Sequence, residues 1–234
     1  ADAAGTTADR GARVIRDWPC AGCLVVLPRT IGRATPVLVA LHGDEGSPDL
    51  IASVMGPAAA ARGLILFAPH CPVARGCSFP NGAATTSSWW GWLQSGRYDE
   101  AWLGAQLGRV TARYRVQHAR KFVAGWSGGA DFLGWYALRH ATTFSAAAFL
   151  AGGVPYYTRC PAAPLPAYFL LGAADPRYLS GQPGQVESVL RSCGGETYVD
   201  TVPNADHQAT LATLWSGKAQ SLVDWLLKHR RAAH

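Results

Sequence analysis

The stretch Lys121-Phe122-Val123-Ala124-Gly125-Trp126-Ser127-Gly128-Gly129 decides the fold of this chain. Residues 121–124 are typical of a strand, Gly-x-Ser-x-Gly follows them, and residues 130–140 have the composition of a helix. A serine at the apex of such a sharp turn requires small residues where strand and helix nearly touch, and Gly125 and Gly129 supply them. The other interpretation is a glycine-rich turn with an incidental serine. The strand before and the helix after favour an elbow that presents Ser127 as a nucleophile.

The composition suits one domain with a sizeable core, because 49% of the 234 residues are hydrophobic and only 15% are charged. No apolar run reaches the roughly 18 residues that a membrane span requires, so we expect a soluble globular protein. The net charge is +6, but the basic residues are scattered singly except at residues 228–231. Without a basic cluster or a recognition motif, we expect no nucleic-acid partner. The predicted organisation is a flexible lead-in at residues 1–19 and one domain at residues 20–234.

The cysteines form an even set of six: Cys20, Cys23, Cys71, Cys77, Cys160 and Cys193. A redox pair at Cys20 and Cys23 would need a thioredoxin-like strand–helix–strand context that the surrounding sequence does not offer, and no second close pair of ligands completes a zinc site. Three disulfides in a secreted or periplasmic protein fit better. Residues 1–7 also resemble a mature end left by signal removal. Nearness in sequence pairs Cys20 with Cys23 and Cys71 with Cys77, which leaves Cys160 with Cys193.

The order of strands and helices predicts an α/β fold. Continuous apolar runs suit strands that are buried on both faces of a parallel sheet. We expect strands at residues 24–27, 35–41, 64–69, 121–124, 144–150, 167–171 and 196–202, and helices at 51–62, 99–115, 130–140, 185–193 and 210–230, the last one interrupted near 216–217. Residues 70–97 read as one long loop. Strands that alternate with helices predict a mainly parallel, doubly wound sheet with helices on both faces.

A catalytic triad is the interpretation that the elbow favours. A serine hydroxyl is a poor nucleophile at neutral pH, so it needs an adjacent base and a carboxylate that orients the base. The chain order Ser127, Asp175, His207 matches the one that accompanies this elbow, and Asp175 follows a predicted buried strand. His207 is the histidine after Asp175 that falls in a loop following a strand. Asp200 and Asp206 are alternatives for the acid because both are near His207 in sequence.

An oxyanion formed at Ser127 would need two N–H donors. The backbone N–H of Gly128 is one, because it begins the elbow helix, and the N–H of Asp44 in the loop after residues 35–41 is the other. A carboxylate beside a developing negative charge is unfavourable, so the Asp44 side chain must point away or be paired. Asp131, four residues after the serine, reads as a charge at the start of a helix.

Tryptophans near this cleft are candidates for substrate contacts. Trp126 adjoins the nucleophile, and Trp89 and Trp90 lie on the long loop, so all three could bind an acyl or aromatic group. The alternative for Trp89 and Trp90 is that they cover the sheet as core. Three further tryptophans have helical spacing and are predicted to be core: Trp135, Trp215 and Trp225.

These motifs together resemble the α/β-hydrolases, and most closely the secreted esterases grouped with polyhydroxybutyrate depolymerases and feruloyl or acetylxylan esterases. The resemblance runs from about Pro36 to the C-terminus. The matching segments are Val39-Ala40-Leu41-His42-Gly43, Gly125-Trp126-Ser127-Gly128-Gly129, Leu171-Gly172-Ala173-Ala174-Asp175 and Asp206-His207. The resemblance implies a Ser-His-Asp hydrolase of carboxylic esters that needs no cofactor or metal. The chain departs from the family at Asp44-Glu45, where an apolar or amide residue is common, and at Gly128.

The expected activity is therefore a serine esterase acting on a small-molecule or polymeric ester. A peptidase on the same scaffold would normally carry a propeller or cap domain, and a catalytically silent binding protein would not need a complete triad. The lipase cap of this fold usually follows the strand after the elbow helix, but residues 154–166 offer only a proline-rich loop. We expect a monomer without a cap, whose open cleft takes short-chain, aromatic or polyester-type substrates.

Overall fold

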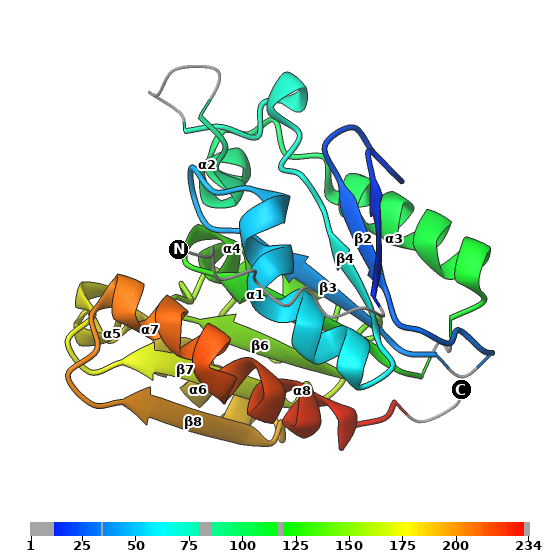
Figure 1. Ribbon diagram of the computed structural model, residues 1–234. Coiled ribbons are helices and arrows are strands. Elements are labelled where there is room, and N and C mark those ends of the chain that lie inside the picture. Colours follow the sequence, from blue (N-terminus) through cyan, green and yellow to red (C-terminus); the bar gives the residue numbers. More distant parts are fainter. Residues whose placement is uncertain (1–11, 34, 80–85, 117–118, 232–234) are drawn as a thin grey trace, which may run out of the picture.

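The computed structural model describes residues 12–33, 35–79, 86–116 and 119–231, and in them eight strands form one twisted sheet (Figure 1). The strand order is β1-β2-β4-β3-β5-β6-β7-β8. All neighbouring strands from β4 to β8 run parallel, whereas β1 and β2 pair antiparallel with each other and β2 pairs antiparallel with β4. The strands are β1 (Arg13–Arg16), β2 (Leu24–Leu27), β3 (Val37–Leu41), β4 (Ile65–Ala68), β5 (Lys121–Trp126), β6 (Ala146–Leu150), β7 (Ala167–Gly172) and β8 (Thr197–Val202).

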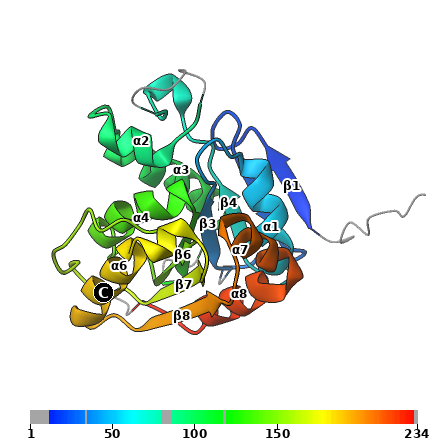
Figure 2. The same cartoon turned by 90° about the vertical axis from the view of Figure 1, so that its left-hand side faces the viewer.

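Helices cover both faces of the sheet, as the alternating pattern predicts. Figure 2 shows α3, α4 and α6 on one side of the strands and α1, α7 and α8 on the other. The helices are α1 (Pro48–Ala61), α2 (Trp89–Gln94), α3 (Glu100–Tyr114), α4 (Gly128–Arg139), α5 (Pro176–Leu179), α6 (Gln182–Ser192), α7 (His207–Thr213) and α8 (Ala219–Leu227), with a 3-10 turn η1 (Val73–Arg75) and a π-helical segment η2 (Leu214–Lys218).

Two hydrophobic clusters lie on the two faces of the sheet and bury its central strands. Every residue of β3 is fully buried, and β4, β6 and β7 are buried along their whole length. Side chains alternate between the two faces of a strand, so Val37 and Val39 join the cluster under α3 and α4 while Leu38 joins the one under α1 and α8. A strand buried on both faces has no polar side, and this is why these strands read as continuous apolar runs.

Several element boundaries differ from the sequence prediction. Residues 13–16 lie inside the expected lead-in, yet they form β1 and pair with β2 along its whole length. A short helix, α2, lies within the expected long loop, and the Ser88 hydroxyl caps it by accepting from the Gly91 N–H at 2.8 Å. Helix α1 begins at Pro48, three residues early, because the Ser47 side chain caps its first turn. The expected interruption at Ser216 and Gly217 is confirmed, since both have non-helical backbone angles.

Three disulfides join the cysteines in the predicted pairing. Cys20 is bonded to Cys23, Cys71 to Cys77, and Cys160 to Cys193. The third bond ties the segment between β6 and β7 to the end of α6, across 33 residues of chain.

None of the helices in the described segments combines the length and the apolar character needed to cross a bilayer.

The Cys160–Cys193 bond should contribute more to stability than the Cys20–Cys23 bond. A cross-link stabilises mainly by restricting the unfolded chain, and the longer closed loop removes more freedom. Replacing Cys160 and Cys193 with serine should lower the free energy of unfolding by about 3–4 kcal/mol, against about 2 kcal/mol for the same change at Cys20 and Cys23. Urea unfolding of both double variants measures the difference. An equal or larger loss at Cys20 and Cys23 would contradict this order.

Candidate active site

The backbone of the elbow holds Ser127 in a conformation that few non-glycine residues adopt. Ser127 has φ 53° and ψ −121°, and its N–H donates to Leu150 O at 2.8 Å. A side chain on Gly125 would lie 2.5 Å from the backbone of Gly129, and one on Gly129 would lie 2.6 Å from His42 O. The glycines therefore permit the close approach of β5, α4 and the loop after β3. The serine hydroxyl stands at the carboxyl end of the sheet as a result.

Ser127, His207 and Asp175 form one continuous chain of hydrogen bonds. His207 Nε2 lies 2.9 Å from Ser127 Oγ, and His207 Nδ1 lies 2.7 Å from Asp175 Oδ2. Because a carboxylate only accepts, Nδ1 carries the proton and Nε2 is free to accept from the serine hydroxyl. Asp175 is 1% exposed and also accepts from the Arg177 N–H at 2.9 Å, which fixes the carboxylate in place. The three sequence-predicted residues meet in space although 80 positions separate Ser127 from His207.

The two alternative acids have other partners. Asp200 accepts from the Tyr168 hydroxyl and pairs with the Lys218 ammonium at 2.7 Å. Asp206 caps α7 by accepting from the Ala209 N–H at 2.8 Å, so His207 is the first residue of that helix rather than a loop residue. Neither carboxylate forms a hydrogen bond with the His207 ring in the described structure. The geometry favours Asp175 as the acid.

The loop after β3 lies directly against Ser127. A side chain on Gly43 would come within 3.1 Å of the Ser127 Cβ and 2.8 Å of the Trp126 ring. His42 holds the loop from within: its Nδ1–H donates to Gly43 O at 2.7 Å, and its Nε2 accepts from the Cys71 N–H at 3.3 Å. Burial lowers the pKa of His42 to about 4, so the ring is neutral and suited to this paired arrangement.

Two backbone N–H groups follow directly in the chain after Ser127 and after Gly43, which packs against Ser127. Gly128 opens α4, where the first N–H groups have no partner within the helix. Within the described parts of the chain, neither the Gly128 N–H nor the Asp44 N–H donates to another group of the protein. These are the two donors expected from the sequence.

The Asp44 carboxylate is paired rather than turned away from the site. Its Oδ1 accepts from the Ser88 hydroxyl at 2.7 Å, and its Oδ2 lies 4.0 Å from the Arg177 guanidinium. A methyl group on Gly128 would lie only 2.1 Å from Asp44 Oδ1, which explains why glycine occupies this position of the elbow. Burial raises the pKa of Asp44, while Ser88 and Arg177 act in the opposite direction.

Asp131 is a buried anchor and not only a charge at a helix start. Its side chain is 5% exposed, accepts from the Gly153 N–H at 2.8 Å and is ion-paired to Arg177. Burial raises the pKa of Asp131, and the Arg177 charge is the largest opposing influence. Sequence reasoning did not identify Arg177 or Ser88. Only their positions in the sequence could have indicated a role, because Arg177 follows Asp175 by two residues and Ser88 lies in the loop that is rich in tryptophan.

The tryptophans depart from their expected roles. Trp89 is fully buried among Trp92, Trp102 and Phe132, so its expected contact with substrate is wrong and it belongs to the core. Trp126 is only 4% exposed, and its ring packs on His207 with centroids 4.7 Å apart, so it supports the His207 ring instead of offering a substrate surface.

Trp90 remains a candidate for a substrate contact. It is partly exposed and packs against Tyr156, with ring centroids 4.0 Å apart. Of the tryptophans predicted as core, Trp225 is buried and Trp135 packs at the margin of one cluster, whereas Trp215 is 54% exposed, contrary to expectation.

A cavity of about 560 Å³ lies beside Asp44, Asp131 and Pro176, the residue that follows Asp175. Aromatic and charged side chains share its wall, including Trp90, Tyr156, Asp44 and Arg177. Within the described residues, no three His, Cys, Asp or Glu side chains are grouped to hold a metal ion.

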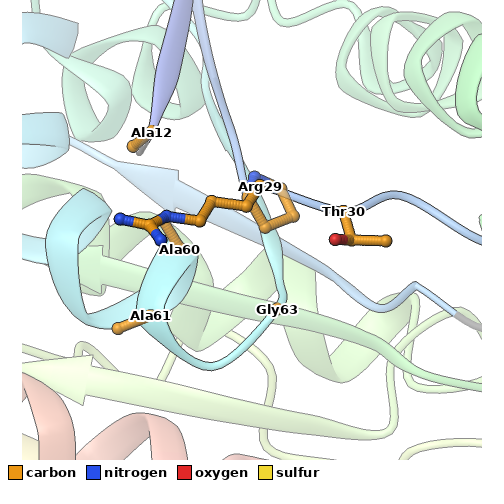
Figure 3. Close-up of a pocket in the computed structure, with 7 residues that line it drawn as sticks. Ala12, Arg29, Thr30, Ala60, Ala61 and Gly63 are labelled. Carbon is orange, nitrogen blue, oxygen red and sulfur yellow. The ribbon is translucent and has the colours of Figure 1, made fainter. Parts of the chain in front are cut away.

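A second cavity, of about 450 Å³, lies near the opposite end of the strands, where Gly63 precedes β4 (Figure 3). Its labelled lining is mostly alanine and glycine, and the Arg29 side chain extends across it toward Ala60. It offers neither a nucleophile paired with a base nor a carboxylate among its lining residues.

Comparison with known proteins identifies similar structures but no similar sequences. No protein-family model matches this sequence, and no curated protein matches it either. A thermostable esterase superposes with a TM-score of 0.63 at 16% identity over 94% of this chain, which spans 63% of that protein. Esterase PE8 gives 0.67 at 18% identity, covering 86% of this chain and 96% of that one. An S-formylglutathione hydrolase from Agrobacterium tumefaciens gives 0.64 at 14% identity, covering 88% of each. Identities this low indicate a shared fold, and the reaction has to be argued from the site.

Proposed function

We propose that this chain, which has the α/β-hydrolase fold, hydrolyses carboxylic esters through an acyl-enzyme on Ser127. Ser127 Oγ attacks the ester carbonyl while its proton passes to His207 Nε2. The Gly128 and Asp44 N–H groups stabilise the oxyanion of the tetrahedral intermediate. Collapse of the intermediate breaks the ester C–O bond, and the leaving alkoxide takes the proton from His207. Water then attacks the acyl-enzyme by the same steps and releases the acid.

The observation that carries this proposal is the unbroken chain from Asp175 through His207 to Ser127. The buried Asp175 stabilises the imidazolium that forms when His207 accepts the serine proton. The Trp126 ring packs against the His207 imidazole and helps to hold it in this orientation. A silent binding protein would not require this tautomer, this strained serine and two free N–H donors together, so the arrangement favours catalysis.

The substrate class is proposed from access to the site. The lipase cap of this fold usually follows β6, but the segment between β6 and β7 contains no helix. The S-formylglutathione hydrolase and PE8 structures are also of comparable length to this chain. A cleft without a cap suits soluble short-chain esters, aromatic esters or a polyester chain lying across the surface. The aromatic pair Trp90 and Tyr156 supports the aromatic and polymeric members of this set. Three disulfides favour a secreted or periplasmic location, and we propose a monomer.

A panel of p-nitrophenyl esters of increasing chain length, beside feruloyl and polyester substrates, tests this proposal. We expect ordinary saturation kinetics, with the highest kcat/KM on short acyl chains, because nothing has to open before a soluble ester reaches Ser127. A sharp rise in rate as the substrate passes its solubility limit would indicate a mobile lid and contradict the open cleft. Absence of hydrolysis across the whole panel would contradict the esterase itself.

A further inference from the structure

The Asp44 carboxylate poses a physical problem for an esterase of this kind. It lies against the Cα of Gly128, whose N–H is one proposed oxyanion donor, while the N–H of Asp44 itself is the other. A full negative charge at this point opposes the negative charge that develops on the carbonyl oxygen. The carboxylate is only 15% exposed, so water screens it little. Something in the protein must offset this charge.

Arg177 is the cation placed to do so. Its guanidinium lies 4.0 Å from Asp44 Oδ2 and is ion-paired with Asp131, so it stands between the partly buried carboxylate of Asp44 and the buried one of Asp131. The other groups that act on Asp44 are Asp131 and Glu45, both like charges, and the neutral Ser88 hydroxyl. Arg177 is thus the positive group facing Asp44 in this part of the site.

The backbone and the side chain of Arg177 contact different carboxylates. Its N–H donates to Asp175 Oδ1 at 2.9 Å and would continue to do so with any side chain other than proline. The guanidinium alone contacts the carboxylates near the oxyanion. This separation lets a side-chain substitution change the charge while the support of the triad acid is kept.

We propose that Arg177 is a positioning residue that neutralises Asp44 and so makes the adjacent pair of N–H groups an effective oxyanion site. This inference rests on the proposed esterase function. The Arg177 side chain forms no hydrogen bond or ion pair with Ser127 or His207 in the described structure, and it acts through Asp44. Its effect should appear in the chemical step, because the ester carbonyl acquires its charge only in the transition state.

A double-mutant cycle between Arg177 and Asp44 tests this proposal. Arg177→Gln removes the charge and keeps a donor for Asp131, so we expect kcat on a short-chain p-nitrophenyl ester to fall about 10- to 100-fold, with KM changed less than about threefold. In an Asp44→Asn background, the same substitution should lower kcat by less than about threefold, because the opposing charge is already gone. Arg177→Lys, which keeps the charge, should restore most of the rate.

The pH profile adds a readout that loss of packing would not change. Without Arg177, the Asp44 carboxyl should take up a proton more readily, because its remaining neighbours include the like charges of Glu45 and Asp131. Protonation removes the opposing charge. The ratio of the Arg177→Gln rate to the wild-type rate should therefore rise as the pH is lowered. A ratio that is flat with pH would overturn the proposal.

Two controls separate electrostatics from structure. Arg191→Gln breaks an ion pair with Glu187 on α6, away from the site, and should leave kcat within about twofold. Asp131→Asn tests the other carboxylate that Arg177 contacts. If the loss of kcat caused by Arg177→Gln disappears in an Asp131→Asn background but persists in an Asp44→Asn background, Arg177 acts by holding the elbow helix and the proposal is wrong. Should Arg177→Gln fail to give a cooperative unfolding transition, Arg177→Met serves as the second neutral variant. A wild-type protein without ester hydrolysis or serine labelling would instead contradict the proposed function.

Discussion

Replacing Ser127 with alanine should lower kcat on a short-chain ester by about four to six orders of magnitude while the protein stays folded. The substitution removes the oxygen on which the proposed acyl-enzyme forms, and the elbow backbone keeps its glycines. Alanine at φ 53° is as strained as serine, so we expect little change in the free energy of unfolding. The kinetics should be measured beside the thermal unfolding of both proteins.

A fluorophosphonate probe gives an independent readout of the same prediction. It should add a single label to the wild-type protein and none to Ser127→Ala, as measured by intact mass. Ser53, which donates its hydroxyl to Leu50 O on the exposed face of α1, offers a matched control: Ser53→Ala should keep both labelling and rate. Labelling of Ser127→Ala, or retention of more than about 1% of the wild-type kcat, would rule out Ser127 as the nucleophile.

Asp175→Asn is expected to have the second largest effect, a loss of about three to four orders of magnitude in kcat. An amide can turn its NH2 group toward His207 Nδ1, which favours the tautomer with the proton on Nε2. In that tautomer the ring cannot accept the proton of Ser127, although every atom is nearly in place. The hydrogen bond from the Arg177 N–H would still be accepted by the amide oxygen.

The two neighbouring carboxylates supply the comparison for Asp175. Asp206→Asn should retain most of the activity, because asparagine caps a helix about as well as aspartate. Asp200→Asn weakens an ion pair with Lys218 outside the triad and should act on stability more than on rate. If either variant abolished turnover while Asp175→Asn kept it, the acid would be misassigned. Ser127→Ala combined with His207→Ala should be no slower than Ser127→Ala alone, because the triad acts as a unit.

Local patterns in the sequence were sufficient to predict the architecture. Buried strands of a parallel sheet leave continuous apolar runs, so β3, β4, β6 and β7 were recognisable without knowledge of their partners. The elbow was recognisable because its glycines and its serine are adjacent in the chain. The disulfide pairing could be predicted for the same reason, since two of the three bonds join cysteines that are 3 and 6 residues apart. In each case the information lies within a few residues of the feature.

These local patterns did not predict which strands pair at the edge of the sheet or which side chains are exposed. β1 has mostly exposed side chains and depends on backbone bonds to β2, so its sequence carries no apolar run. Trp89 and Trp215 have the same side chain, yet one is fully buried and the other 54% exposed, because the elements packed around each differ. The spacing of a tryptophan on a helix does not say which face the rest of the chain covers.

The sequence alone determined an α/β fold, a serine elbow and the residues from which a triad could be drawn. Only the tertiary structure distinguished Asp175 from Asp200 and Asp206, because the distinction depends on which carboxylate reaches His207 Nδ1. Only it brought Arg177, on α5, beside Asp44, which lies in the loop after β3 and is far from Arg177 in the chain. The physical reason is the same in both cases: strand and turn preferences are properties of neighbouring residues, whereas hydrogen bonds and charge pairing between distant segments exist only once the sheet has brought their loops to one edge.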